Sequence, residues 1–506
     1  MGDSRMRITV RNLGVLKEAA IDLKPLTIFV GPNNAGKTWL AYVLAGIFGP
    51  YGYEEYVESD EQGDIAISYP SLENALENLL KTGSATIDLV QFADDYAEQY
   101  FNNVARSTSH WMPEFMGSQV ASFDRLDISI ALDERKKHVL ERVLNFPLRR
   151  EISGSLHGPS LSIRKKRGER TLSVYMTTQF LASDENSSEE AVVEPPSPDI
   201  IKEFLLRAVF EVIHRSLYPH IRILPTERTT FITLPFRREV HEESAMLKEK
   251  LSEQETRAVL APVVSFLHMI SSTFDDESAE RAQRARSART NPQIREYIQL
   301  AQLLEKQILH GAVKISPAKP VAALNQVGGD SSQEILFQPD ESSQLEIAIA
   351  SSMAKELSPL VLYLRYLVLP DELLIIDEPE MNLHPEAQAK ITEFLAMLVN
   401  AGLNILVTTH SPYVVDHLAN LLKAAEKTGE EKEAVRDEFY LQRTDAFIPK
   451  DKVSVYLIEE GTAKNALDED GAIQWNTFGD VSDRISEIYF KTTKRLFAFW
   501  NSRARS

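Results

Sequence analysis

The sequence predicts an α/β fold, and three apolar runs support this prediction. Residues 26–30 (LTIFV) have the composition of a buried strand, and a glycine-containing loop and an apolar helix over 39–45 follow at once. Residues 373–377 (LLIID) and 404–409 (NILVTT) have the same character, and each run leads into polar residues. Continuous apolar strands of this length occur in parallel sheets that helices cover on both faces. We therefore expect these runs to be neighbouring strands of one sheet.

The loop after the first run matches G-x-x-x-x-G-K-[ST], a pattern that binds phosphate groups. Its residues are Gly31, Pro32, Asn33, Asn34, Ala35, Gly36, Lys37 and Thr38. Gly31 and Gly36 allow the main chain to wrap phosphate oxygens, and the following helix adds its positive N-terminal end. Lys37 can reach the β- and γ-phosphates, and the Thr38 hydroxyl can bind Mg²⁺. A chance match in an ordinary turn is the alternative, but the strand before the loop and the helix after it favour a nucleoside triphosphate site.

Length, charge and composition limit the remaining possibilities. The chain has 506 residues, which suggests two or three structural units, and 25% of its residues are charged. It contains no cysteine, which excludes disulfides, thiolate metal sites and cysteine nucleophiles. The net charge of −19 argues against a protein that coats nucleic acid by bulk electrostatics, although it permits a local basic groove. Because no apolar leader and no run of about eighteen apolar residues is evident, we expect a cytoplasmic protein with no membrane contact.

Residues 1–235 form the first of three predicted parts of the chain. Strands and helices are expected over the following ranges: strands 8–10, 20–23, 64–68, 126–132, 171–176 and 221–224, and helices 71–81, 87–106 and 199–216. We interpret the middle of this part as an antiparallel β-lobe with helical decoration, attached to the nucleotide-binding core. Residues 183–198 are acidic and rich in Ser and Pro, which predicts a mobile surface loop.

The second and third parts are residues 236–310 and 311–506. Helical patterns at 237–273 and 291–310 predict an inserted helical arm, which resembles an antiparallel helix pair. Strand signals resume at 312–315 and 335–337 and lead into the third part, which completes the nucleotide-binding core and ends in a C-terminal tail.

Polar residues follow two of the apolar runs where the carboxyl edge of the sheet is expected. Asp377 and Glu378 end the run 373–377, and His410 follows the run 404–409. Ligands bind at the carboxyl ends of parallel strands, so these side chains are expected to meet the nucleotide. Asp377 would hold Mg²⁺, Glu378 would orient or deprotonate the attacking water, and His410 would lie near the γ-phosphate. Acids at a strand end and a capping histidine are common by themselves, but their combination with the phosphate loop favours catalytic roles.

Several stretches resemble ABC-type ATPases of the SMC and RecF kind. The N-terminal pattern ITVRNLGVLKEAAIDLKPLTIFVGPNNAGKT, the Walker B and D-loop stretch LLIIDEPEMNLHP and the switch-histidine stretch VTTHSP carry the resemblance. It identifies ASSMAKEL, residues 350–357, as the signature. This implies that Ser351, Ser352 and the N-terminus of their helix cap the γ-phosphate bound by the opposite subunit. The usual glycine is replaced by Met353, and a plain N-capped helix is the alternative.

The motifs GPNNAGKT, LPTER, ASSMAKEL, DEPEMNLHP and TTHSP together resemble the OLD-type (overcoming lysogenisation defect) ABC ATPases, over roughly residues 1–50 and 220–480. Members include ATPase subunits of antiphage systems such as Gabija, Septu and PARIS, and retron-associated ATPases. The resemblance implies an ABC-type P-loop ATPase head that hydrolyses ATP with Mg²⁺. It also implies a head-to-tail dimer around two ATP molecules, or a higher oligomer, and a larger assembly with a nuclease or toxin.

Some family members carry a Toprim nuclease, and residues 455–461 superficially resemble the opening of one. Asp480 and Asp483 do not form the D-x-D that a Toprim needs, so we expect a terminal strand pair here and an effector on a separate polypeptide. We therefore predict an ATPase that acts as sensor and scaffold of an antiphage complex, which a phage trigger perturbs. The alternative is a RecF-like or SMC-like DNA-repair clamp. The form of the DEPE motif disfavours a transporter ATPase.

Three basic stretches could contact DNA. They are residues 164–170, which resemble a hairpin tip, residues 281–289 in the predicted arm, and residues 494–505 at the C-terminus. A solvated charged surface is the alternative for each of them.

Overall fold

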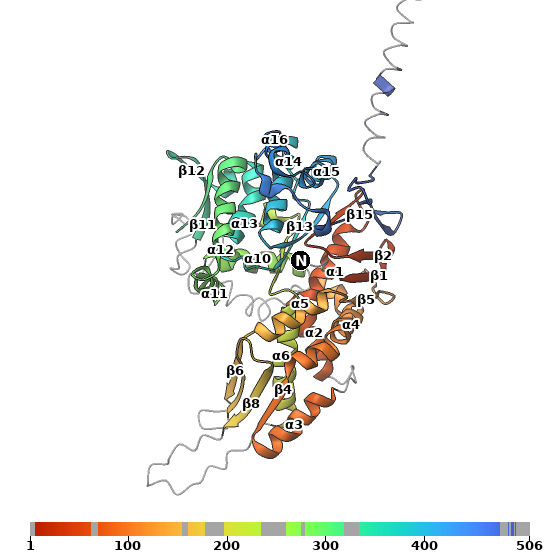
Figure 1. Cartoon of the computed structure of the whole chain (residues 1–506), viewed down its shortest axis with the longest axis vertical. Coiled ribbons are helices and arrows are strands. Elements are labelled where there is room, and N and C mark those ends of the chain that lie inside the picture. Colours follow the sequence, from red (N-terminus) through yellow and green to blue (C-terminus); the bar gives the residue numbers. More distant parts are fainter. Residues whose placement is uncertain are drawn as a thin grey trace, which may run out of the picture.

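The structure is a computed structural model, and it describes residues 6–61, 69–153, 160–177, 197–233, 260–274, 279–317 and 333–475, with a few more between 484 and 491 (Figure 1). The predicted strand 64–68, the basic stretch 494–505, and Asp480 and Asp483 lie outside the described residues. Almost all of the predicted acidic loop 183–198 does so too.

A nine-stranded sheet forms the centre of the head, in the order β5-β1-β2-β16-β15-β3-β14-β13-β9. Its strands are β1 (Arg7–Leu13), β2 (Leu16–Asp22), β3 (Leu26–Val30), β5 (Asp127–Ala131), β9 (Ile221–Leu224), β13 (Leu373–Asp377), β14 (Asn404–Thr409), β15 (Val453–Glu459) and β16 (Thr462–Asn465). The five strands β9, β13, β14, β3 and β15 run parallel, whereas β1 pairs antiparallel with β2 and β5. This arrangement confirms the predicted α/β fold, and the antiparallel β15–β16 pair confirms the expected terminal strand pair.

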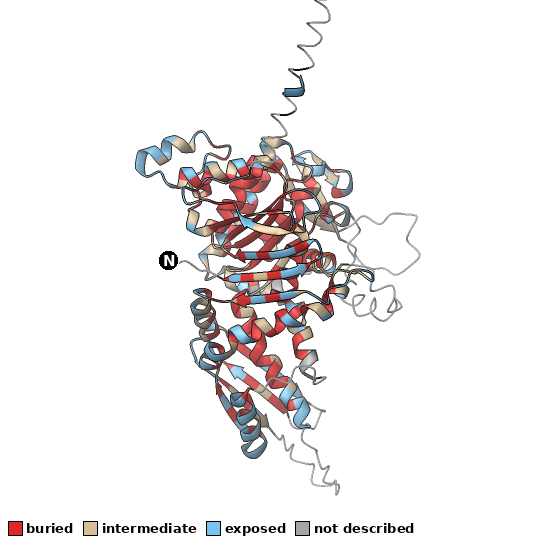
Figure 2. Cartoon of the chain, turned by 90° about the vertical axis from the view of Figure 1, so that its right-hand side faces the viewer, coloured by how far each residue is buried: buried red, intermediate tan, exposed pale blue. Residues whose placement is uncertain are grey.

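Hydrophobic cores lie on both faces of this sheet. The side chains of β3 alternate between them: Phe29 packs into one core, and Ile28 and Val30 pack into the other. This follows because successive residues of a strand point to opposite faces. Figure 2 shows that the strands of the head are largely buried. The helices of the head include α1 (Lys37–Phe48), α13 (Ser352–Tyr366), α14 (Pro385–Asn400), α15 (Pro412–Ala425), α16 (Gly429–Arg436) and the short α7 (Arg228–Phe231), with 3-10 turns at Ile347–Ile349, Thr444–Ala446 and Lys450–Lys452.

A lobe extends from the head and contains a second sheet, in the order β4-β8-β7-β6 (Figure 1). Its elements are α2 (Pro50–Glu61), α3 (Pro70–Thr82), β4 (Ser84–Asp88), α4 (Leu89–Phe115), α5 (Arg135–Asn145), β6 (Leu148–Ser153), β7 (Ser160–Lys165), β8 (Thr171–Thr177) and α6 (Pro198–Leu217). All its strand pairs are antiparallel, which confirms the predicted antiparallel β-lobe. Of its predicted strands, 171–176 is β8, whereas 126–132 is β5 and pairs with β1 in the head sheet. The helix predicted over 87–106 begins only at Leu89, because the preceding residues pair with β8 and Asp88 caps the helix through Gln91 N.

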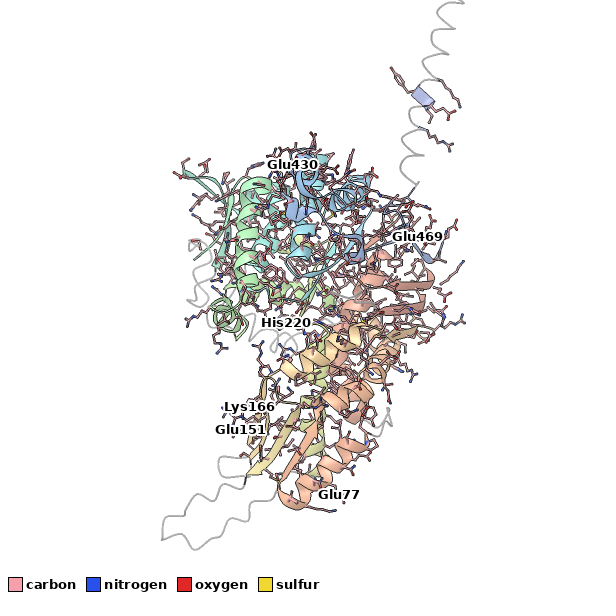
Figure 3. All side chains as sticks on the ribbon, viewed as in Figure 1. Glu77, Glu151, Lys166, His220, Glu430 and Glu469 are labelled. Atoms are coloured by element: carbon pink, nitrogen blue, oxygen red, sulfur yellow. The ribbon has the colours of Figure 1, made fainter. Side chains whose placement is uncertain are left out.

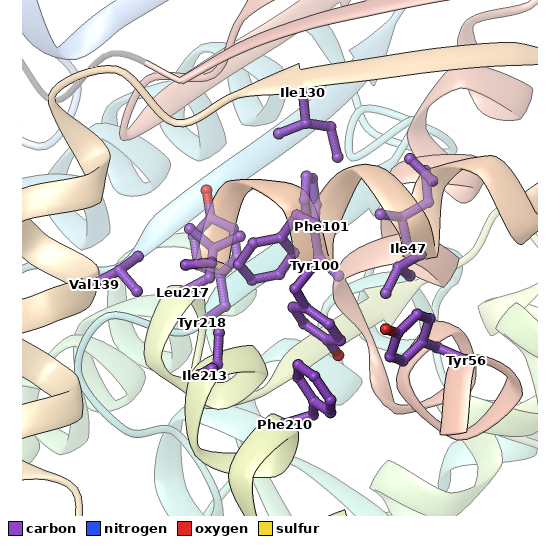
Figure 4. Close-up of a cluster of buried hydrophobic side chains, with 14 of the residues drawn as sticks. Ile47, Tyr56, Tyr100, Phe101, Ile130, Val139, Phe210, Ile213, Leu217 and Tyr218 are labelled. Carbon is purple, nitrogen blue, oxygen red and sulfur yellow. The ribbon is translucent and has the colours of Figure 1, made fainter. Parts of the chain in front are cut away.

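Aromatic packing fixes the lobe to the end of α1. Tyr56, Tyr100 and Phe210 come from α2, α4 and α6, and the rings of Tyr100 and Phe210 stack with centroids 4.7 Å apart (Figure 4). Beside them, His214 is fully enclosed and lies 2.9 Å from both the Tyr100 hydroxyl and the Gly49 carbonyl oxygen at the C-cap of α1. The lobe is therefore anchored to the helix that leaves the phosphate loop.

The described helices within the predicted arm pack against the head. The described helices are α10 (Ala261–Phe274), α11 (Ala279–Ala288) and α12 (Pro292–Leu303), followed by a π-helical turn at Leu304–Leu309. Phe266 and Ile270 of α10 and Tyr297 of α12 are buried in the core that contains Val30. The apolar faces of these described helices cover the sheet, and the inserted arm over 236–310 stays a prediction.

Two further features complete the described fold. The strands β10 (Ala312–Pro317), β11 (Gln333–Asp340) and β12 (Ser343–Glu346) form a small antiparallel sheet, which confirms the strand signals at 312–315 and 335–337. Within the described part of the chain, no helix is both long and apolar enough to cross a bilayer.

Candidate nucleotide-binding site

The phosphate loop joins β3 to α1, and its glycines occupy positions that no larger residue fits. Gly31 and Gly36 have φ angles of 152° and 99°. A Cβ atom on Gly31 would lie 2.2 Å from the Ile458 carbonyl oxygen, and one on Gly36 would lie 2.9 Å from Leu16 Cγ. No side chain caps the N-terminus of α1, so its first N–H groups face the loop. Such a loop can surround an anion with main-chain donors.

Lys37 lies inside this loop. Its Nζ donates to the carbonyl oxygens of Gly31 and Pro32 at 2.9 and 2.8 Å, and the residue is 5% exposed. Burial lowers the pKa of Lys37, and the carboxylates of Glu378 and Asp377 oppose this shift. The ammonium group therefore sits between the loop and the acidic end of β13, where it can neutralise phosphate charge.

Asp377 and Thr38 come together although 339 residues separate them. The Thr38 hydroxyl donates to Asp377, 3.0 Å from Oδ1 and 3.2 Å from Oδ2, while Thr408 Oγ1 also donates to Oδ1 and Tyr42 OH lies 3.4 Å from Oδ2. Burial raises the pKa of Asp377, and the hydrogen bonds from Thr408 and Thr38 oppose this shift. Neighbouring oxygen ligands of Mg²⁺ lie about 2.9 Å apart in an octahedron. The spacing and the oxygen chemistry of this pair therefore fit a magnesium site.

Glu378 and His410 meet because β13 and β14 are adjacent parallel strands. Glu378 Oε1 lies 3.1 Å from His410 Nδ1, and the two side chains are 21% and 40% exposed, so both are open to a ligand. Glu378 has a φ of 50°, which is rare for a residue with a side chain, and its N–H donates to the Thr408 carbonyl oxygen at 3.0 Å. The loop thus turns the Glu378 side chain away from the strand direction and toward His410.

Glu380 stabilises the end of β14, where Thr409 and His410 lie. It is 3% exposed, and its Oε1 accepts from Thr409 Oγ1 at 2.6 Å and from the His410 N–H at 3.0 Å. The same oxygen lies 3.5 Å from His410 Nδ1. Glu380 therefore positions His410 through its main chain.

Arg228 connects this site to the signature helix. It is 1% exposed, and Nη1 donates to the Asp377 and Pro225 carbonyl oxygens at 2.6 and 2.7 Å, while Nη2 donates to the Glu378 carbonyl oxygen at 2.7 Å. Its guanidinium group also forms an ion pair with Glu356 of α13, which is equally buried. Burial lowers the pKa of Arg228 to about 10, and the nearby carboxylate of Asp377 opposes this shift.

The comparisons with known proteins agree with this geometry. A model of the family described as "AAA domain, putative AbiEii toxin, Type IV TA system" matches residues 26–416, from the first residue of β3 into α15. The chain belongs to this family. A search of curated proteins finds no match.

Similar solved structures include two SMC heads and RecF. The Smc head domain from Pyrococcus furiosus, bound to the C-terminal domain of ScpA, has 11% identity and a TM-score of 0.36, with 96% of this chain and 99% of that chain covered. The SMC head domain from Thermotoga maritima has 10% identity and a TM-score of 0.28, with 91% and 97% covered. The recombination mediator protein RecF with ATPrS has 11% identity and a TM-score of 0.31, with 92% and 99% covered.

The fold of this AAA-domain protein is an α/β fold built on a mixed sheet, with the phosphate loop at the carboxyl end of β3. The chain's own sheet order supports this description, since the strand before the phosphate loop, the strand with the paired acids and the strand before His410 are β3, β13 and β14.

The signature serines are not part of the same cluster. Ser351 caps α13 by accepting from Ala354 N at 3.2 Å, and both Ser351 and Ser352 are exposed. Among the described residues, no hydrogen bond or ion pair joins either serine to the phosphate loop.

Four residues of this site have no role in the sequence-based prediction. Arg228, Glu380, Thr408 and Glu356 all lie inside motifs or elements that the sequence singles out, but the patterns assign them no contact. The signal that could have found Arg228 and Glu356 is a charged residue in an otherwise apolar or buried segment, because a buried charge needs a partner.

Proposed function

We propose that this protein binds ATP with Mg²⁺ and hydrolyses it at the edge of the sheet where β3, β13 and β14 end. The observation that supports this most strongly is the cluster of Lys37, Thr38, Asp377, Glu378 and His410, which the fold brings together from two distant parts of the chain. Mg²⁺ held by Thr38 and Asp377 would neutralise charge on the β- and γ-phosphates.

Each side chain has a distinct task in this proposal. The main-chain N–H groups of residues 31–38 and the Lys37 ammonium hold the phosphates. Glu378 accepts a proton from the water that attacks the γ-phosphorus, and the bond from that phosphorus to the β–γ bridging oxygen breaks to release ADP. His410 lies beside Glu378 and fixes the orientation of that carboxylate.

We further propose that two chains form a head-to-tail dimer, in which the signature of each chain closes over ATP bound to the other. The exposed N-terminus of α13 with Ser351 and Ser352 supports this, because helix N-termini bind anions. Exposed apolar residues near the same edge fit a surface that a partner covers: Val15 beside Gly36, Ile349 before the signature and Tyr413 after His410 are 60%, 65% and 50% exposed.

The ATPase would act as sensor and scaffold of an antiphage defence complex that a phage trigger perturbs. The family description names a putative toxin of a type IV toxin–antitoxin system, which supports a role in such a system. In this proposal the ATPase controls an effector, either a nuclease or a toxin. The stretch 455–461, which resembles a Toprim opening, forms most of β15 and pairs with β3 inside the ATPase sheet. These residues are therefore part of the ATPase sheet. In this proposal the nuclease or toxin is a separate chain.

A RecF-like or SMC-like DNA clamp is the second candidate. The basic stretch 164–170 is the tip of the β7–β8 hairpin, and Figure 3 labels Lys166 there on the lobe. On β6, Arg149 lies directly opposite Arg164, and among the described residues neither has an ion-pair partner. Like charges directly opposite each other destabilise a sheet, so a phosphate backbone would relieve them.

Co-purification distinguishes the two candidates. The tagged chain would be co-expressed with its genomic neighbours, purified with ATP and Mg²⁺, and its complex weighed by native mass spectrometry. A stable assembly with a nuclease or toxin subunit supports the defence complex. A bare dimer whose ATPase activity rises with double-stranded DNA, and no longer rises after Arg164→Glu, supports the clamp instead.

A further inference from the structure

The ion pair between Arg228 and Glu356 joins two elements that serve different nucleotides. Glu356 lies on α13, five residues after Ser351, so the two are about 7.5 Å apart along one rigid helix. Arg228 donates to the main-chain oxygens of Asp377 and Glu378. The carboxylate of Asp377 in turn accepts from Thr38 of the chain's own phosphate loop. In the proposed dimer, α13 touches the ATP held by the partner.

We propose that the Arg228–Glu356 pair is the coupling element between the two ATP sites of the dimer, with Arg228 as a positioning residue for Glu378. This rests on the proposed function, because it requires a signature that acts on the partner's nucleotide. A movement of α13 when its signature engages ATP shifts Glu356, and Arg228 transmits this shift to the main chain of Glu378.

Burial and charge support a role beyond stability. Arg228 and Glu356 are each 1% exposed, and buried ion pairs contribute little net stability because both ions lose their hydration. Arginine is also needed for the geometry, since its planar fork reaches several acceptors at once and a lysine ammonium cannot span them.

The main chain at Glu378 is the sensitive point in this linkage. Its φ of 50° is unfavourable for a residue with a side chain, so its surroundings must hold it there. Two hydrogen bonds do so: the Glu378 N–H donates to the Thr408 carbonyl oxygen at 3.0 Å, and the Glu378 carbonyl oxygen accepts from Arg228 at 2.7 Å. Loss of the Arg228 contact would therefore change where the Glu378 carboxylate points.

The test measures ATP hydrolysis by the full-length protein against ATP concentration at saturating Mg²⁺. For Glu356→Gln and for Arg228→Lys, kcat falls about 10- to 100-fold, as expected when a reacting group is misplaced by about 1 Å. The KM for ATP stays within about threefold, because the phosphate loop is untouched. The Hill coefficient, above 1 for the native dimer, falls to 1.

Two further variants separate coupling from folding. The double variant Arg228→Met with Glu356→Leu removes both charges, so its Tm lies above that of Glu356→Leu alone, which leaves Arg228 buried without its carboxylate, while the Hill coefficient stays at 1. Glu305→Gln is the control, because Glu305 of the π-helical turn forms a partly buried ion pair at 2.5 Å with Arg365, which lies on α13 as Glu356 does. That pair is bonded to β10 rather than to the nucleotide edge, so Glu305→Gln lowers the Tm and leaves the Hill coefficient unchanged.

The outcomes separate this proposal from the one on which it rests. If Glu378→Gln abolishes turnover but Glu356→Gln keeps the native kcat and Hill coefficient, the coupling role is wrong and the ATPase assignment stands. A native Hill coefficient of 1 also overturns the coupling role. If Glu378→Gln hydrolyses ATP at the native rate, the proposed function itself is wrong.

Discussion

Gly31 offers the sharpest structural test of the phosphate loop. Replacing Gly31 with alanine would place a Cβ atom 2.2 Å from the Ile458 carbonyl oxygen, whereas real Cβ contacts essentially never fall below 3.0 Å. The loop must therefore move by about 0.8 Å, because Ile458 is held in β15 beside β3. A displacement of about 1 Å in a catalytic site typically costs about 100-fold in rate. We expect Gly31→Ala to lower kcat/KM for ATP by about 30- to 100-fold.

The matched control is Gly168→Ala in the β7–β8 turn. Gly168 also has a positive φ, 79°, but a Cβ atom there would meet nothing within 4 Å. Both variants carry the conformational cost of alanine at positive φ, about 1–2 kcal/mol, and only Gly31→Ala carries the clash. Phosphate release and binding of a fluorescent ATP analogue would be measured for both. Native ATP affinity and turnover in Gly31→Ala would refute the assignment of this loop.

Three further predictions use residues with matched controls or a defined pH range. Lys37→Ala weakens ATP binding about 10- to 100-fold, as measured by calorimetry. The control Lys165→Ala removes another buried lysine that donates to two carbonyl oxygens, and it leaves the ATP affinity native. Equal effects of the two variants would contradict the role of Lys37. Thr38→Val raises the Mg²⁺ concentration needed for half-maximal hydrolysis about 10- to 100-fold, whereas the control Tyr42→Phe changes it less than twofold. An unchanged Mg²⁺ requirement in Thr38→Val would argue against metal binding by Thr38 and Asp377. Burial lowers the pKa of His214 from 6.5 to about 4. Between these pH values the unfolded chain binds one more proton than the folded chain, so the free energy of unfolding falls by about 3 kcal/mol as the pH decreases through this range. Urea unfolding of His214→Gln should show a flatter pH dependence, and an unchanged slope would count against this origin.

The site was predictable where its parts are contiguous in sequence. The phosphate loop and the acids after β13 each occupy a few adjacent residues, and the character of the strands beside them indicates the sheet edge. Adjacent parallel strands then place Glu378 and His410 within 3.1 Å of each other. The side chains that the sequence indicates therefore do lie together at this edge, and their roles stay predictions.

The rest depends on tertiary contacts that leave no local pattern. Arg228 reaches Asp377 across 149 residues, and Glu356 lies in a helix whose sequence shows only where it begins. The helices over 261–274 and 292–303 were predicted from their periodicity, yet periodicity does not say which surface an apolar face covers. The described helices cover the head sheet, which their periodicity alone could not indicate.

The Glu378→Gln variant tests the central claim most directly. Purified native protein and the variant would be given ATP and Mg²⁺, and phosphate release and molecular mass would be measured on the same samples. We expect the native protein to hydrolyse ATP, and the variant to bind ATP, lose nearly all turnover and accumulate as a stable dimer. A variant that hydrolyses ATP at the native rate, or that stays monomeric with ATP bound, would contradict this account.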